Sequence, residues 1–167
     1  MAITRLNDNS ITSITALPSG CTSASGLSLG KVLQVVTLEK APAEQASSSS
    51  SFVTPSGYGI TITPSATSSK ILVQIMGGGT ANPPSGQATN YSIFRGTTNL
   101  GNASYGFMRT YGDDRIDTSL AMQVLDTPNT TSATTYNLYY RSYAGGTVYL
   151  QQTVSGVITF TAMEIAG

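Results

Sequence analysis

The stretch KILVQIM at residues 70–76 contains the clearest strand pattern in the chain. Successive side chains of a β-strand point to opposite faces, so every second residue lies on the same side. One face of this stretch carries Ile71, Val73 and Ile75. The other face carries Leu72, Gln74 and Met76. Because only the first set is wholly apolar, we expect it to point into the core of a layered β-structure.

Eight runs of this kind follow one another, each rich in Val, Ile, Leu, Tyr or Thr and bounded by Gly, Pro, Asn or Ser clusters. They cover residues 32–38, 58–63, 70–76, 91–95, 120–126, 136–143, 147–152 and 157–165. No helical period lies between them, so the chain is predicted to be all-β. Eight strands fit an antiparallel jelly-roll sandwich of two sheets. A weaker ninth run at residues 105–111 is predicted to be an extra edge strand.

The last run carries apolar residues on both faces. Ile158, Phe160 and Ala162 share one face. The opposite face mixes threonines with Val157, Met163 and Ile165. A strand that is apolar on both faces is predicted to be central in its sheet or to lie at a subunit interface.

Five tyrosines occur within fourteen residues, between Tyr136 and Tyr149. The segment Ala144-Gly145-Gly146 predicts a hairpin between the two runs that hold them. Its outer face would gather Tyr139, Tyr143 and Tyr149 beside Arg141, whereas Tyr136 and Tyr140 would point inward. Tyrosine combines an apolar ring with a polar hydroxyl, so such a patch suits an oligomer contact. The alternative is that the rings cap an exposed sheet face singly, and a register error of one residue would exchange the two sets.

Charge and composition exclude several partners. The chain has 167 residues, which fits one domain with a core of its own. Eight basic and eight acidic side chains cancel, and 10% of the residues are charged, so no basic stripe exists for nucleic acid or an anionic membrane. The first ten residues lack the apolar core of a secretory signal, and no apolar run could cross a bilayer. We expect synthesis in a cytoplasm, with no nucleic-acid or membrane partner.

Neither catalysis nor metal binding is expected. The chain contains no histidine and a single cysteine, Cys21, which rules out an internal disulfide and the usual metal sites. The acidic stretch DDRID at residues 113–117 lacks the spacing and the glycine of a calcium loop. No pair of carboxylates is placed to act as acid and base. We therefore expect no enzyme and no cofactor.

The first thirty residues differ in character from the rest. Five of the apolar side chains in residues 1–30 are scattered among Ser, Thr and Asn, too sparse for a core of their own. They are Ile3, Leu6, Ile11, Ile14 and Leu17. An extended chain of this length could span up to roughly 100 Å. We expect an anchoring arm that becomes ordered on a partner, followed by a domain at residues 31–167; the alternative is a disordered leader.

Five stretches, taken in order, resemble small virion proteins of tailed phages that infect cyanobacteria and other aquatic bacteria. They are GKVLQVV (30–36), ITITPSATSSKILVQIMG (60–77), SIFRGTTNLG (92–101), VLDTPNTTSATTYNLYYRS (124–142) and ITFTAMEI (158–165). The resemblance covers nearly the whole chain after Gly30. It implies a trimeric jelly roll similar in outline to tumour necrosis factor and complement globular heads. The chain departs from the pattern at Gly77-Gly78-Gly79 and Asn82-Pro83-Pro84, where a longer and looser loop is expected.

The resemblance implies either a capsid decoration (cement) protein or the end domain of a tail fibre. We favour a homotrimeric decoration protein that binds the major capsid protein on the outer capsid surface of the virion. Five residues are expected at the trimer interface: Tyr139, Arg141, Tyr143, Tyr149 and Met163. The alternative is a tail-fibre or receptor-binding tip that recognises a host surface glycan, although such a tip is expected to carry a long repetitive shaft.

Overall fold

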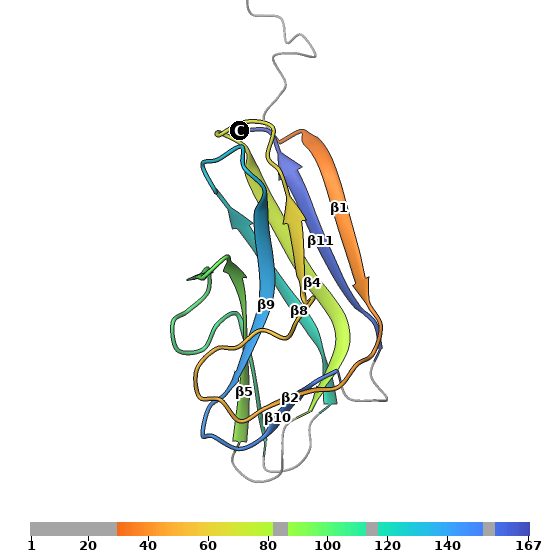
Figure 1. The fold of residues 1–167 in the computed structure, drawn as a ribbon, viewed down its shortest axis with the longest axis vertical. Coiled ribbons are helices and arrows are strands. Elements are labelled where there is room, and N and C mark those ends of the chain that lie inside the picture. The colour runs from red at the N-terminus through yellow and green to blue at the C-terminus, as the bar shows by residue number, and fades with distance from the viewer. Residues whose placement is uncertain (1–29, 82–86, 113–116, 152–155) are drawn as a thin grey trace, which may run out of the picture.

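In the computed structural model of the protein, residues 30–81, 87–112, 117–151 and 156–167 are described. Within these ranges the chain forms β-strands and turns, and two sheets face each other as a sandwich (Figure 1). Of the predicted anchoring arm, only Gly30 belongs to the described residues; the five predicted anchoring residues and Cys21 lie outside them.

Sheet A contains four strands that lie side by side along most of their length. In spatial order they are β1 (Val32–Lys40), β11 (Ile158–Ile165), β4 (Lys70–Ala81) and β8 (Asp117–Asp126). Beyond the end of β11, the far end of β4 pairs instead with the short strand β10 (Val148–Leu150). A second short strand, β2 (Gln45–Ser47), pairs with the outer edge of β10.

Sheet B packs against sheet A. Its strands lie in the order β3 (Gly59–Ile62), β9 (Thr134–Ser142) and β5 (Gln87–Arg95). The remaining edge of β5 is shared by β7 (Met108–Gly112) and the two-residue strand β6 (Thr98–Asn99). The named strands of both sheets pair antiparallel.

The strand order is that of a jelly roll. Eight of the described strands contain four residues or more: β1, β3, β4, β5, β7, β8, β9 and β11. Counted along the chain, these eight lie in the order 1-8-3-6 in sheet A and 2-7-4-5 in sheet B. Chain neighbours therefore lie in opposite sheets, except for the fourth and fifth strands, β5 and β7, which pair within sheet B, as in two interlocked Greek keys. The predicted eight-stranded antiparallel jelly-roll sandwich is confirmed.

Each of the eight predicted runs coincides with a strand or part of one. One of the eight runs, however, is not among the eight strands that form the jelly roll. The run at residues 147–152 forms only the three-residue strand β10. The weaker run at residues 105–111, predicted to be an extra edge strand, overlaps β7, which pairs along five residues of β5 at the edge of sheet B and completes the eight strands of the jelly roll. The alternation of this run is weak because the buried residue of β7 is a threonine and its outward side chains are an arginine and a tyrosine.

The predicted hairpin between β9 and β10 is wrong. The strand β9 belongs to sheet B and β10 to sheet A, so the connection through Gly145 crosses from one sheet to the other. Both edges of β9 are already taken, one by β3 and the other by β5. A glycine-rich turn allows the chain to reverse, but the reversed strand can pair only where an edge is free.

The core lies between the two sheets and follows the alternation read from the sequence. The side chains of Ile71, Val73 and Ile75 are fully buried, as predicted. The side chains of Tyr136 and Tyr140 are also buried and point inward, as predicted. The strand β11 is central, with β1 on one edge and β4 on the other, which confirms one of the two positions expected for it.

The glycines of β4 form a bulge inside the strand, which corrects the expectation of a loose loop at this point. Gly77 and Gly78 have φ angles of +87° and +67°, which L side chains rarely adopt. A Cβ on Gly77 would lie 2.4 Å from the backbone oxygen of Val157. Glycine is therefore required both by the backbone conformation and by the close approach of β11. The Asn82-Pro83-Pro84 part of the predicted loop lies outside the described residues.

Candidate interaction surfaces

The outer face of sheet A carries an apolar row that crosses four strands. Directly paired residues on β1, β11, β4 and β8 form this row: Val35, Met163, Leu72 and Leu125. Val35 and Leu125, at the two ends of the row, are 54% and 53% exposed. Met163 and Leu72, in the middle, are half-buried between their neighbours. Because outward side chains of a sandwich normally face water, such a row indicates a surface with a further contact to make.

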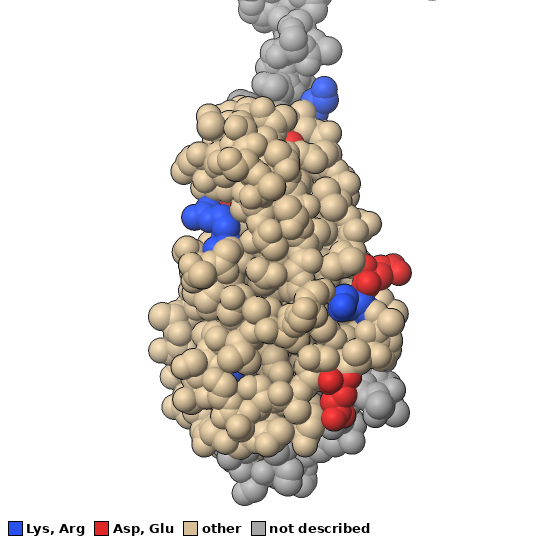
Figure 2. Space-filling model, viewed as in Figure 1, with Lys and Arg blue, Asp and Glu red and all other residues tan. Residues whose placement is uncertain are grey.

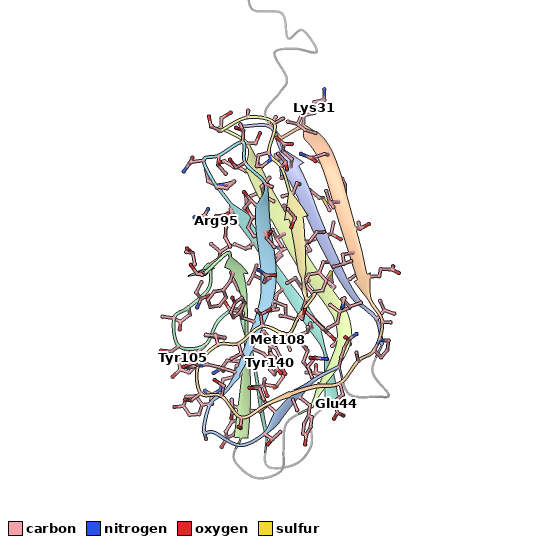
Figure 3. The ribbon with its side chains drawn as sticks, in the orientation of Figure 1. Lys31, Glu44, Arg95, Tyr105, Met108 and Tyr140 are labelled. Carbon is pink, nitrogen blue, oxygen red and sulfur yellow. The ribbon has the colours of Figure 1, made fainter. Side chains whose placement is uncertain are left out.

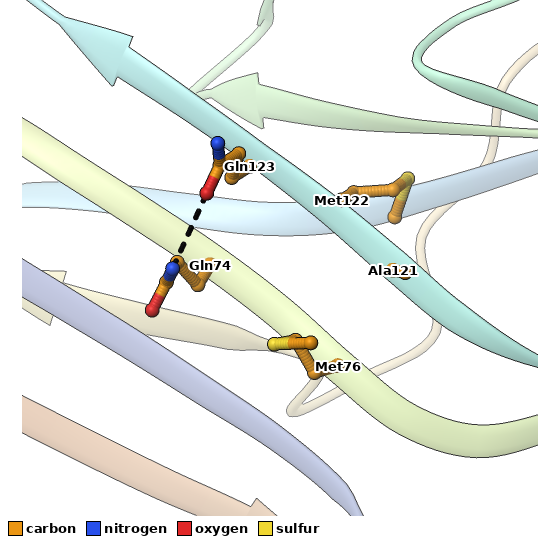
Figure 4. A pocket seen from close by; sticks show the side chains of 5 residues that line it. All are labelled: Gln74, Met76, Ala121, Met122 and Gln123. Carbon is orange, nitrogen blue, oxygen red and sulfur yellow. Dashed lines mark hydrogen bonds between the residues drawn. The ribbon is translucent and has the colours of Figure 1, made fainter.

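A polar row without charges runs beside the apolar row. It consists of Thr37, Thr161, Gln74 and Gln123, again paired directly across the four strands. The Gln74 side-chain nitrogen donates to the Gln123 side-chain oxygen at 3.3 Å, as Figure 4 shows. These two glutamines, together with Met76 and Ala121, line an open hollow of about 300 Å³. The two rows together are uncharged, and Lys70 and Glu39 lie beyond them at opposite ends of the face.

The outer face of sheet B is different, because aromatic rings and arginines gather there. The ring of Tyr139 on β9 stacks on the ring of Phe94 on β5, with ring centroids 3.9 Å apart. The ring of Phe52 packs against Phe94 at 5.6 Å. The guanidinium of Arg141 lies 5.1 Å from the centroid of the Phe52 ring and donates to the carbonyl oxygens of Ser50 and Ser104. The chain's own loops therefore partly cover Tyr139 and Arg141.

A second group of side chains lies on the same face, nearer its edge. The guanidinium of Arg109 lies 4.5 Å from the ring centroid of Tyr143, 5.3 Å from that of Tyr105 and 5.4 Å from that of Tyr111. We call these four residues the Arg109 cluster. The three rings are between 45% and 57% exposed. Tyr105 lies on the loop at the left of the molecule in Figure 3.

The five predicted interface residues do not form one patch. Tyr139, Arg141 and Tyr143 lie together on the outer face of sheet B. Met163 lies on the outer face of sheet A, on the opposite side of the sandwich. Tyr149 lies on β10, where it pairs with Ala46 and Ala81. The contact of these five residues with another subunit stays a prediction. The contact of the anchoring arm with the capsid also stays a prediction.

Several surface residues were missed by the sequence-based prediction. The alternation that placed Ile71 and Val73 inward also places Leu72 outward, so the apolar row was open to prediction strand by strand. The continuity of the apolar row across the sheet could not be predicted, because it depends on the register between strands. Arg109 and Tyr111 could have been found in the same way, since they alternate with the buried Thr110. Tyr105 belongs to the cluster but lies on a loop, and the position of a loop side chain cannot be predicted from strand alternation.

The groups with shifted pKa values lie between the sheets, away from both surfaces. Burial, followed by a 2.7 Å hydrogen bond that the Tyr136 hydroxyl donates to Asp126, raises the pKa of Tyr136. Asp126 in turn pairs with Arg95 at 2.9 Å. Burial raises the pKa of Tyr140 to about 12. These tyrosines stay protonated at physiological pH, and the Arg95–Asp126–Tyr136 network fastens sheet A to sheet B.

Within residues 30–81, 87–112, 117–151 and 156–167, no three His, Cys, Asp or Glu side chains gather closely enough to hold a metal ion. The same ranges contain no helix with the length and hydropathy of a membrane span. Most of the acidic stretch at residues 113–117 lies outside them. Charged side chains are few and scattered over the face shown in Figure 2.

No protein-family model matches the chain, and no curated protein matches it. Its fold is similar to solved structures of infectious bursal disease virus. The VP2 subviral particle has a TM-score of 0.45 and 17% identity over 80% of this chain and 33% of that chain. The Gx strain (TM-score 0.40) and the Gt strain (TM-score 0.37) are 14% identical over 94% of this chain and 42% and 43% of those chains. The chain thus spans less than half of each solved chain, and the likeness concerns the fold alone.

Proposed function

We propose that this chain is a structural virion protein, a trimeric decoration protein on the outer surface of a phage capsid. The observation that carries the proposal is the outer face of sheet A, where the apolar row and the polar row cover four strands without a charge. The resemblance to small virion proteins over strand and turn segments supports the same role. The role we infer is assembly rather than catalysis, and it needs no cofactor.

The outer face of sheet A suits contact with further copies of this chain. Adjacent strands lie about 4.8 Å apart, so four aligned apolar side chains extend over roughly 15 Å. Burying such side chains is favourable, and leaving them exposed promotes uncontrolled association. The faces of three copies can gather around one axis because neither row carries a charge that would repel a neighbouring copy. The threonines and glutamines of the polar row can exchange hydrogen bonds at the same time.

A closed trimer limits which residues can meet. Three subunits close around one axis through head-to-tail contacts, in which one part of each subunit's surface meets a different part of the next subunit. We place the outer face of sheet A at that axis, which puts Met163 in the contact. Tyr139, Arg141 and Tyr143 then lie on the far side of the subunit, outside this contact. Of the five predicted interface residues, this arrangement keeps Met163, which belongs to the apolar row.

Oligomeric state tests this proposal. We expect light scattering to show a trimer at micromolar concentration, and we expect Val35→Glu and Leu125→Glu to shift it to monomer. Both side chains are more than half exposed, so these substitutions leave the core intact. Thr61→Glu, on an exposed position of sheet B, is the matched control and should remain trimeric. A monomeric wild-type protein, or variants that keep the wild-type mass, would overturn the proposal.

The position in the particle needs a separate experiment. We expect an electron-microscopy reconstruction of the intact virion to show this chain repeated over the whole shell, in contact with the major capsid protein. A few copies confined to the tail vertex would contradict a decoration role and favour the tail-fibre or receptor-binding alternative.

A further inference from the structure

The Arg109 cluster has the chemistry of a binding site and lies apart from the surface used in the proposed trimer. Arg109 itself is exposed, so its guanidinium is accessible from solvent. In the described part of the chain no carboxylate forms an ion pair with Arg109 or with Arg141. The guanidinium of Arg109 lies over tyrosine rings, and a cation–π contact of this kind uses none of its hydrogen-bond donors.

The register of sheet B places two arginines in one cross-strand row. Asn90 on β5 pairs with Arg109 on β7 at one edge and with Arg141 on β9 at the other. The two arginines are therefore about 10 Å apart, two strand spacings. Two buried polar atoms in this row, the Asn90 side-chain oxygen and the Arg141 Nε, have no hydrogen-bond partner among the residues that the structure describes. In a chain with eight basic residues, this row is a local concentration of positive charge and unused polar atoms.

The loop that carries Tyr105 is held in place before any ligand arrives. The Asn102 side-chain oxygen accepts hydrogen bonds from the backbone nitrogens of Ser104 and Tyr105 at 2.8 and 2.9 Å. The carbonyl oxygen of Ser104 in turn accepts hydrogen bonds from Asn90 and Arg141. The loop is thus tied to sheet B on the side of the arginine row. A preorganised aromatic surface binds without the cost of ordering a loop.

We propose that the Arg109 cluster binds an acidic saccharide, with the carboxylate of a uronic-acid unit on Arg109 and the sugar faces on the tyrosines. A guanidinium binds a carboxylate through two parallel hydrogen bonds. Tyrosine rings offer a flat apolar face to the C–H groups of a sugar and a hydroxyl to its oxygen atoms. Single-stranded nucleic acid would also stack on tyrosines, but it needs a continuous basic groove along its backbone, and this chain has zero net charge.

The test measures binding of defined oligosaccharides to the full-length protein by calorimetry. The probes are an oligogalacturonate and an oligomannuronate, and the matched neutral probe is the methyl ester of the oligogalacturonate. We expect at least one acidic probe to bind and the neutral ester to bind about tenfold more weakly or not at all, because the ester lacks the charge. Binding should also weaken with added salt.

Variants separate the cluster from general charge effects. Arg109→Gln should weaken binding of the acidic probe by about tenfold or more, and Arg109→Lys should restore only part of it, because lysine lacks the planar fork. Tyr143→Ala should also weaken it, whereas Lys31→Gln, which removes an exposed charge elsewhere, should not. Circular dichroism confirms that each variant is folded. Failure of both acidic probes, equal binding of the ester, unchanged binding by Arg109→Gln, or tighter binding of an oligothymidylate would each overturn the proposal.

Discussion

Glu164 illustrates how a single residue is stabilised inside the sandwich. It is 1% exposed and lies on the inner side of β11. Its Oε1 accepts hydrogen bonds from the Ser65 nitrogen, the Ser65 hydroxyl and the Ser69 hydroxyl at 2.7, 2.6 and 2.7 Å. Its Oε2 accepts one from the Gln34 side chain at 2.6 Å. Burial alone would raise the pKa of the Glu164 carboxyl, but these hydrogen bonds outweigh burial and lower the pKa to about 2.

This lowered pKa predicts an acid-dependent loss of stability. The unfolded chain binds a proton at Glu164 near its ordinary pKa of 4.5, whereas the folded chain binds it only near pH 2. The contribution of Glu164 to the free energy of unfolding is therefore full above pH 4.5 and declines as the pH falls toward 2. Glu164→Gln should lower the free energy of unfolding at pH 7 by about 1.5–3 kcal/mol and flatten this decline.

Urea unfolding at pH 7, 4 and 3, at one protein concentration, measures both effects. Glu44→Gln is the matched control, because Glu44 is an exposed carboxylate in the connection between β1 and β2. It should unfold like the wild-type protein at each pH. If the wild-type and Glu164→Gln curves decline in parallel with falling pH, the hydrogen bonds to Glu164 do not stabilise the fold in the way proposed.

At the scale of the element, the bulge in β4 lets one long strand serve two partners. Up to Gly77 the edge of β4 pairs with β11, and from Thr80 onward the same edge pairs with β10. The pairing with β8 on the other edge shifts register between these two residues. The positive φ angles of Gly77 and Gly78 produce this local change of direction.

Gly78→Ala should therefore be strongly destabilising. Its Cβ would lie 2.3 Å from the Cγ1 atom of Ile158, and its φ of +67° is strained for alanine. We expect the free energy of unfolding to fall by about 2–4 kcal/mol, the sum of backbone strain and overpacking. Gly96→Ala is the matched control, since Gly96 has a φ of +57° but no atom within 4 Å of an added Cβ. Equal losses in the two variants, measured by urea unfolding, would show that packing at the bulge is unimportant.

At the scale of the whole molecule, the sandwich closes its own core within the described residues. The buried cluster draws side chains from both sheets, and the described strands begin at Val32. Burying the five apolar arm residues on a partner would contribute roughly 1.5–3 kcal/mol each. Ordering the arm backbone costs about 1–2 kcal/mol per residue. Backbone pairing must therefore assist, and the Ile-Thr alternation at residues 11–15 is suited to adding a strand to a partner sheet.

Deleting residues 1–28 should leave folding nearly intact and abolish anchoring to the particle. We expect the thermal midpoint to change little and co-sedimentation with undecorated capsids to be lost. A full-length variant with serine at Ile3, Leu6, Ile11, Ile14 and Leu17 should also fail to co-sediment, which separates loss of apolar contacts from loss of length. Capsid binding by the truncated protein as tight as that of the full-length chain would show that the jelly roll itself makes the contact.

The local pattern of the sequence predicted much of this fold. Alternation at Ile71, Val73 and Ile75 identified the inward face of β4, and the same rule oriented Tyr136 and Tyr140. A side chain's face depends only on its position within its own strand, so the alternation reports it directly. The count of eight strands, with turn residues between them, was enough to predict the jelly-roll class.

The partners of each strand were decided by the tertiary structure. The glycine-rich turn after β9 predicted a hairpin, but β3 and β5 occupy both edges of β9, so β10 pairs in the other sheet. The apolar row likewise exists because the register aligns Leu72 with its neighbours on β11 and β8. The Arg109 cluster exists because a loop brings Tyr105 beside β7. Alternation is a property of one strand and is written in a few consecutive residues. Pairing and register depend on which edges remain free once distant segments have packed, and no short stretch of sequence contains that information.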